Sequence, residues 1–248
     1  MNRILLLILS AVALPSAASD MTMVPAGRYS PFFVRKADKP VDIAEFRIDR
    51  TAVTNSEFLA FVEAHPQWRR SAVPQVFAEA GFLAHWRGDL TLPENAARQP
   101  VTNVSWFAAT AFCAAQGKTL PSTDQWEYLL QDRARDVAAV RQTILDWYGV
   151  PNGAALASVD SLPPNGYGVA GLVGLIWEWT SDYSAAMAGA ELRNSGDKNG
   201  ALFCGGGSLG AKDGSDYAAF MRYAFRASLK AAYVTHNLGF RCAAEVGS

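Results

Sequence analysis

The residue types best suited to chemistry, thiols and imidazoles, are few in this sequence. It contains three cysteines and three histidines. No two of His65, His85 and His236 stand at the spacing of paired metal ligands. His65 and His85 are therefore interpreted as structural or surface residues. In an exported protein, an odd number of cysteines leaves one thiol that is reactive, a metal ligand, or buried and inert.

The amino-terminal segment predicts export. Residues 1–19 combine Arg3, an apolar run over residues 4–14, and small residues that follow a proline. This pattern is typical of a signal peptide, and the apolar run is too short to span a bilayer. We expect cleavage after Ala18 or Ser19, a periplasmic or secreted location where disulfides persist, and no membrane attachment after cleavage.

The composition is that of a globular domain. The 248 residues carry 22 basic and 23 acidic side chains, a formal net charge of -1, and half of them are apolar. The near-neutral balance excludes a general nucleic-acid binder, and the apolar fraction excludes a disordered chain. Because the sequence has neither a linker nor a repeat, we expect one domain over residues 20–248, present as a monomer.

Helix caps mark the elements of the first half. Thr54 and Glu57 form a capping-box pattern, Ser105 and Ser122 stand at two further helix starts, and Gly117 ends the second helix. The expected elements are helices over 55–64, 106–116 and 122–144, with an interruption around 133–136, and strands over 29–34 and 41–48. Residues 66–100 are expected to be irregular. After residue 148, the abundance of Gly, Asn and Ser predicts loops held by polar networks, with only short strands.

Four segments, in order, resemble one family. They are residues 100–106 (PVTNVSW), 117–128 (GKTLPSTDQWEY), 165–168 (NGYG) followed by 177–182 (WEWTSD), and 206–208 (GGS) followed by Arg226 and 239–242 (GFRC). The sequence is identified on these motifs as a member of the formylglycine-generating enzyme, or sulfatase-modifying factor, family. The resemblance covers roughly residues 23–243 and implies a single loop-rich α+β domain with a C-type-lectin-like core.

The family's oxidase chemistry lacks its ligands here. Formylglycine-generating enzymes bind Cu(I) with two cysteines that follow the GGS motif, since soft thiolates select Cu(I). Gly210 and Ala218 stand at those two positions. Copper is therefore not expected in the family manner, and formylglycine generation is not expected, although another reaction stays open.

The resemblance also implies how the cysteines are used. Cys113 and Cys242 occupy positions that form a disulfide in secreted members of the family. Cys204 is then left over, in the run 202–208 (LFCGGGS). We favour a buried, inert thiol because Phe203 is adjacent; the alternative is a metal ligand or a reactive thiol.

A pocket and a weak calcium site follow from the same resemblance. Expected pocket residues are Trp177, Ser208, Tyr217, Arg222, His236 and Asn237, with Arg226 nearby. Two arginines and a tyrosine are suited to a carboxylate or a peptide backbone, and the alternative is a structural ion pair, which we favour for Arg226. The positions of the calcium ligands are Gly171, Gly174, Ile176 and Glu178, of which Gly171 lacks a side-chain oxygen. The family's other calcium loop, over residues 147–156, is shortened here. In the alternative, Glu178 accepts backbone N–H bonds instead of a calcium ion.

Three functions remain open at this level. The run from 220 to 230 resembles a non-sulfatase branch that includes the accessory protein encoded beside copper nitrite reductase in denitrifying bacteria. The first hypothesis is an accessory or maturation factor for a protein or peptide client, such as a periplasmic reductase. The second is an enzyme acting on an unknown small substrate or peptide through Tyr217, His236 or Cys204, and the third is a lectin-like binding module.

Overall fold

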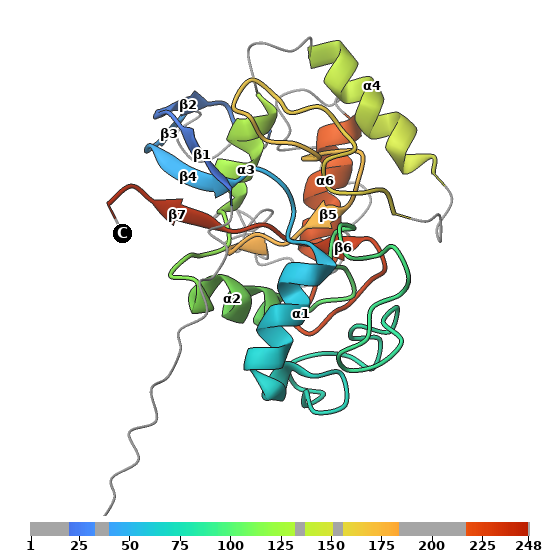
Figure 1. The fold of residues 1–248 in the computed structure, drawn as a ribbon. Helices are drawn as coiled ribbons and strands as arrows, with labels where there is room; N and C mark the ends of the chain where they lie inside the picture. The colour runs from blue at the N-terminus through green and yellow to red at the C-terminus, as the bar shows by residue number, and fades with distance from the viewer. Residues whose placement is uncertain (1–19, 33–39, 132–136, 151–155, 184–216, 248) are drawn as a thin grey trace, which may run out of the picture.

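A three-stranded antiparallel sheet brings the two ends of the domain together. The computed structural model describes residues 20–32, 40–131, 137–150, 156–183 and 217–247 (Figure 1). Strand β4 (Phe46–Asp49) lies between β1 (Met21–Val24) and β7 (Ala243–Glu245). Met21 pairs with Asp49 on one edge of β4, and Ala243 pairs with Ile48 on the other. The first and last strands therefore depend on the same central strand.

The strand expected over residues 41–48 is two strands in different sheets. β3 (Val41–Ile43) pairs with β2 (Gly27–Tyr29), whereas β4 joins the terminal sheet. The buried side chains are Ile43, Phe46 and Ile48, so the alternation changes parity where Ala44 and Glu45 are exposed. Side chains of one continuous strand alternate strictly between its two faces, so a single strand cannot bury these three residues on the same face. The other expected strand ends at Tyr29, and its positions 33 and 34 lie outside the described residues.

The first three helices begin where their caps predicted. Helix α1 (Asn55–Ala64) has the full capping box, in which the Thr54 hydroxyl accepts from the Glu57 N–H and the Glu57 carboxylate accepts from the Thr54 N–H. Ser105 caps α2 (Trp106–Ala115), and Ser122 caps α3 (Thr123–Leu130). Gly117 has a φ of +68°, the left-handed conformation that ends a helix. Residues 66–100 hold one short 3-10 turn, η1 (Pro66–Trp68).

Helix α6 (Tyr217–Ser228) corrects the prediction that the second half contains only loops and short strands. Its buried face is formed by Ala218, Ala219, Arg222, Tyr223 and Arg226. Two of these five side chains are arginines, so the inward face does not show as an apolar stripe in the sequence. Helix α4 (Val137–Tyr148) packs beside α6 (Figure 1). The interruption expected around 133–136 falls outside the described residues.

A disulfide joins the helical core to the terminal sheet. Cys113 on α2 is bonded to Cys242, which precedes β7, and both residues are fully buried. The pairing is the one that the family resemblance implied. Around it, Phe58 of α1 stacks on Phe112 of α2, and the ring of Phe240 packs edge-on against both. The result is one α+β domain whose core links elements from both halves of the chain.

Two other short strands position residues of the family motifs. Strand β5 (Trp177–Glu178) runs parallel to β6 (Leu238–Gly239), so the WEWTSD and GFRC segments lie side by side. Gly239 is required there, because a Cβ on this residue would lie 2.3 Å from the Val101 carbonyl oxygen. Among the described helices, none combines the length and the apolar character needed to cross a membrane.

Candidate functional site

Four aromatic rings from three elements form a stack beside α6. The rings of Tyr148 and Trp177 lie 5.4 Å apart and nearly parallel, and Phe225 stacks on Trp177 with a centroid distance of 4.2 Å. Trp147 contacts Trp177 at 5.0 Å. We call these residues, Trp147, Tyr148, Trp177 and Phe225, the aromatic stack. All four side chains are only partly buried, so the stack meets solvent.

The end of α4 and the start of α6 hold the stack in place. The Tyr148 hydroxyl donates to the Ala218 carbonyl at 3.4 Å. Burial raises the pKa of Tyr148 above its ordinary value, so its hydroxyl stays protonated and acts as a donor. Tyr217, the first residue of α6, is 58% exposed. These contacts correct the expectation that residues 147 and 148 belong to a shortened calcium loop, because they form the last turn of α4.

A buried carboxylate lies between two arginines on the inner face of α6. Arg222 donates through Nε and Nη2 to the two oxygens of Glu127, at 3.3 and 3.0 Å, and Arg226 donates through Nη1 at 2.6 Å. The guanidinium of Arg226 also lies over the ring of Trp126, at 4.3 Å from its centroid. We call Glu127, Arg222 and Arg226 the charge cluster. Burial favours a protonated Glu127, but the two guanidiniums outweigh it and hold the pKa of Glu127 below its usual value.

A second buried ion pair occupies the expected calcium position. Arg241 donates through Nη2 to Glu178 Oε1 at 2.7 Å and through Nε to Glu178 Oε2 at 2.9 Å, and both side chains are fully buried. Trp126 Nε1 donates to the same carboxylate at 2.9 Å. The remaining Arg241 donors reach the carbonyls of Asp49, Arg50 and Ala170. The partners of Glu178 are thus side-chain donors, not the backbone N–H groups of the alternative prediction.

The residues at this position do not fit calcium. Ca²⁺ takes six to eight oxygen ligands, and the guanidinium of Arg241, within hydrogen-bonding distance of Glu178, repels a dication. Gly171 offers no side-chain oxygen, and Gly174 and Ile176 can contribute only their backbone carbonyls. Within the described ranges, no group of three or more His, Cys, Asp or Glu residues is arranged to hold a metal ion.

The remaining expected pocket residues are placed only in part. The carbonyl of Asn237 accepts from the Trp177 N–H at 2.7 Å, and its side-chain oxygen accepts from the Thr235 hydroxyl. Asn237 therefore adjoins the stack through its backbone, whereas the side chain of His236 is exposed. Ser208, Cys204 and Gly210 lie outside the described residues.

The two other histidines agree with the structural interpretation. His65 follows α1 and its Nδ1 lies 3.0 Å from the Phe61 carbonyl. His85 is partly buried, with Nε2 3.2 Å from the side-chain oxygen of Asn55. Burial, followed by the charge of Arg70, lowers the pKa of His85 to about 4, so its ring is neutral at physiological pH.

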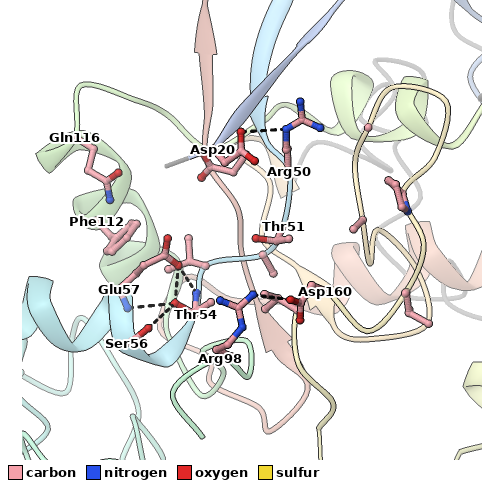
Figure 2. A pocket seen from close by; sticks show the side chains of 18 residues that line it. Asp20, Arg50, Thr51, Thr54, Ser56, Glu57, Arg98, Phe112, Gln116 and Asp160 are labelled. Carbon is pink, nitrogen blue, oxygen red and sulfur yellow. Dashed lines mark hydrogen bonds and ion pairs between the residues drawn. The ribbon is translucent and has the colours of Figure 1, made fainter. Parts of the chain in front are cut away.

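A separate hollow lies at the start of α1 (Figure 2). Its volume is about 490 Å³, and it shares no lining residue with the aromatic stack or the charge cluster. Two ion pairs stand on its walls, Asp20 with Arg50 and Arg98 with Asp160 (Figure 2). In each pair both partners are largely exposed, and such pairs contribute little to stability. The residues that line this hollow come from segments far apart in the chain, so no local sequence pattern predicts it.

Sequence reasoning missed Glu127, Tyr148 and Phe225 at the main site. In the sequence, Glu127 stands out only as a member of the 117–128 motif. A carboxylate on the buried side of a helix indicates that a cationic side chain is buried beside it. Phe225 is three residues from Arg222, a spacing that places them on neighbouring positions of one helix. A helix predicted over residues 217–228 would therefore have placed Phe225 next to Arg222.

The comparisons with known proteins identify the family and the fold. The family model of the sulfatase-modifying factor enzyme 1-like domain matches residues 11–246. A formylglycine-generating enzyme of Bos taurus is 28% identical over 291 residues, covering 93% of this chain and 76% of that protein. The inactive C-alpha-formylglycine-generating enzyme 2 of Bos taurus is 29% identical, covering 95% of this chain and 88% of its own length. The solved structure of PvdO from Pseudomonas aeruginosa has the same fold, with a TM-score of 0.52 and 17% identity over 94% of this chain and 97% of that one. This chain therefore belongs to the sulfatase-modifying factor family.

Proposed function

We propose that the protein is an exported accessory or maturation factor that binds a protein or peptide client at the aromatic stack. The observation that carries this proposal is the partly exposed stack of Tyr148, Trp177 and Phe225 beside α6. Partly exposed aromatic rings with polar groups at one edge are typical of peptide-binding surfaces, because they bury a large apolar area at a low cost in side-chain entropy.

The residues near α6 support a role other than formylglycine generation. Ala218, at the position of the second copper cysteine, is 1% exposed and carries no thiol. Cys113 and Cys242 are consumed by the disulfide. Incubation with a sulfatase Cys-X-Pro-X-Arg peptide and copper is therefore expected to leave the peptide unchanged. A product about 18 mass units lighter, the change from thiol to aldehyde, would contradict this part of the proposal.

The electrostatics also support binding over catalysis. A general base or nucleophile needs a titratable group poised at the site. The carboxylate of Glu127 is held charged between Arg222 and Arg226, and Tyr148 is held protonated. Among the described residues, the candidates for a catalytic group at this site are then Tyr217 and His236, and both side chains are exposed. Exposed side chains are less well preorganised for catalysis than buried ones, which favours the client-binding role.

The client that we propose is a periplasmic reductase of the copper nitrite reductase type. This choice rests on the signal-like segment of residues 1–19 and on the resemblance of the 220–230 run to the accessory protein encoded beside that enzyme. We also propose that Arg241 provides the positive charge at Glu178, so that neither calcium nor copper is needed at these positions.

The test is direct binding of the mature protein to purified copper nitrite reductase, in its apo and copper-loaded forms. We expect micromolar affinity that falls at least about tenfold, or 1.4 kcal/mol, in Trp177→Ala. The matched control is Phe77→Ala, which removes an aromatic ring of 42% exposure that packs on Trp68 and Phe107 and has no ring contact with the stack. Binding that is absent, or that Trp177→Ala leaves unchanged, would contradict the proposal.

A further inference from the structure

The charge cluster contains more positive than negative charge. One carboxylate, Glu127, faces two guanidiniums, and only 6% of its side chain is exposed, against 10% for Arg222 and 3% for Arg226. Charges removed from water are normally balanced, because an uncompensated buried charge is costly. Another buried carboxylate, Glu178, is already paired with Arg241. Among the described residues, no second acidic side chain contacts Arg222 or Arg226.

Both guanidiniums also retain unused N–H groups. Arg222 uses Nε and Nη2 on Glu127, and none of the described side chains or carbonyls accepts from its Nη1. Arg226 uses Nη1, whereas its Nε is buried without a hydrogen-bond partner in the described structure. A buried N–H donor without an acceptor is destabilising. The unused N–H groups of Arg222 and Arg226 and the excess positive charge of the cluster therefore both indicate that an acceptor with negative charge binds there.

The missing acceptor would lie next to the aromatic stack. Arg222 and Phe225 are three residues apart on α6, and Phe225 stacks on Trp177. The Tyr148 hydroxyl reaches the Ala218 carbonyl, one helical turn before Arg222, and the Arg222 charge acts on that hydroxyl. A ligand that packs on the rings can therefore place a small anionic group against the unused Nη1 of Arg222.

We infer that the site recognises a carboxylate adjacent to an aromatic or apolar side chain, with the carboxylate completing the charge balance of Arg222 and Arg226. The inference rests on the proposed function above, and it names the chemical feature of the client. A carboxylate matches the planar fork of a guanidinium and accepts charge-assisted hydrogen bonds, which an amide cannot do with equal strength. The carboxylate can come from a chain terminus or from an acidic side chain.

The first experiment compares matched probes on the wild-type protein by calorimetry and tryptophan fluorescence. N-acetylphenylalanine is compared with N-acetylphenylalaninamide, and N-acetyl-Phe-Glu-amide with N-acetyl-Phe-Gln-amide, each up to millimolar concentration. We expect the acid of at least one pair to bind about tenfold more tightly than its neutral partner. The first pair reports a terminal carboxylate and the second an acidic side chain. Equal affinity within both pairs, or no binding of any probe, would overturn the inference.

Two substitutions in the charge cluster should change the affinity for the acid in opposite directions. A cluster that only stabilises the fold would not produce this pattern. Glu127→Gln raises the net charge of the cluster and should strengthen acid binding several-fold, leaving the amide unchanged. Arg222→Gln removes the excess charge and should abolish the preference for the acid. Arg98→Gln, which alters an exposed ion pair at the separate hollow, should keep the wild-type preference. Circular dichroism and the intact Cys113–Cys242 bond establish folding; if either variant does not fold, the wild-type probe comparison decides.

The outcomes separate this inference from the proposed function. If Trp177→Ala abolishes reductase binding while acids and amides bind equally, the client-binding role stands and the carboxylate recognition is wrong. If the acid preference is observed but the reductase does not bind, the ligand chemistry stands and the choice of client is wrong.

Discussion

Replacing both Cys113 and Cys242 by alanine should remove a large share of the stability of this domain. The bond spans a sequence separation of 129 residues. In the chain-entropy description, a loop of this length stabilises the folded state by about 5 kcal/mol, because the unfolded chain loses conformations. A domain is typically stable by about 5–15 kcal/mol, so the variant should be marginally stable or unfolded at 37 °C.

The measurement is urea unfolding, followed by tryptophan fluorescence. With a slope of about 3 kcal/mol per molar urea, the loss corresponds to a midpoint lowered by roughly 1.5 M or more. Cys204→Ala is the control, and its midpoint should fall by much less than that of the double variant. A double variant that loses less than about 1 kcal/mol would refute the loop-closure reasoning. Peptide mapping without reductant should recover the 113–242 linkage, and a bridge that contains Cys204 would refute the assignment.

Four other outcomes are expected. The pKa of His85 is about 4 in the folded protein, below its ordinary value of 6.5. As the pH falls, the His85 ring is therefore protonated in the unfolded chain before it is protonated in the folded one. The free energy of unfolding should fall by up to about 3 kcal/mol between pH 6.5 and pH 4. Urea unfolding at several pH values should show that fall, and His85→Gln should remove most of it. Gly239→Ala should cost at least about 3 kcal/mol, since the new Cβ would meet the Val101 carbonyl, whereas Gly117→Ala, with open space around it, should cost only about 1 kcal/mol. EDTA or millimolar calcium should leave the melting temperature unchanged, because Arg241 already neutralises Glu178; stabilisation by calcium of several degrees would disprove this. Arg241→Met should destabilise by about 3–5 kcal/mol in thermal unfolding, since it leaves Glu178 charged and buried, and a neutral effect would count against that pairing.

The sequence was most informative where a local rule acts within a few residues. Thr54 and Ser105 cap helices because a hydroxyl satisfies N–H groups one turn away, and this requires no tertiary structure. The family resemblance added the cysteine pairing and the fold. It also placed the WEWTSD and GFRC motifs, whose strands turned out to be adjacent.

Elements stabilised by polar packing were not predictable in the same way. Helix α6 buries Arg222 and Arg226 against Glu127, a residue on a helix almost a hundred positions earlier. A periodicity analysis counts such arginines as surface residues, so the helix was missed. The break between β3 and β4 was missed because three buried side chains suggested one strand, although their spacing changes by one residue.

The aromatic stack required the positions of three elements at once. Trp147 and Tyr148 come from the end of α4, Trp177 from β5, and Phe225 from α6. Only Trp177 carried a motif signal. The others became part of the site because α4 packs on α6, which sequence spacing alone does not reveal.

The position of β4 has a consequence for the order in which the elements of the chain can pair. One edge of β4 pairs with β1, about 25 residues away, but the other waits for β7, which follows almost two hundred residues later. At a synthesis rate of about 5–20 residues per second, β7 is made roughly 10–40 s after β4. Until then, neither the sheet nor the bond at Cys242 can be completed. The chain therefore keeps an open strand edge on β4 until β7 is available to pair with it.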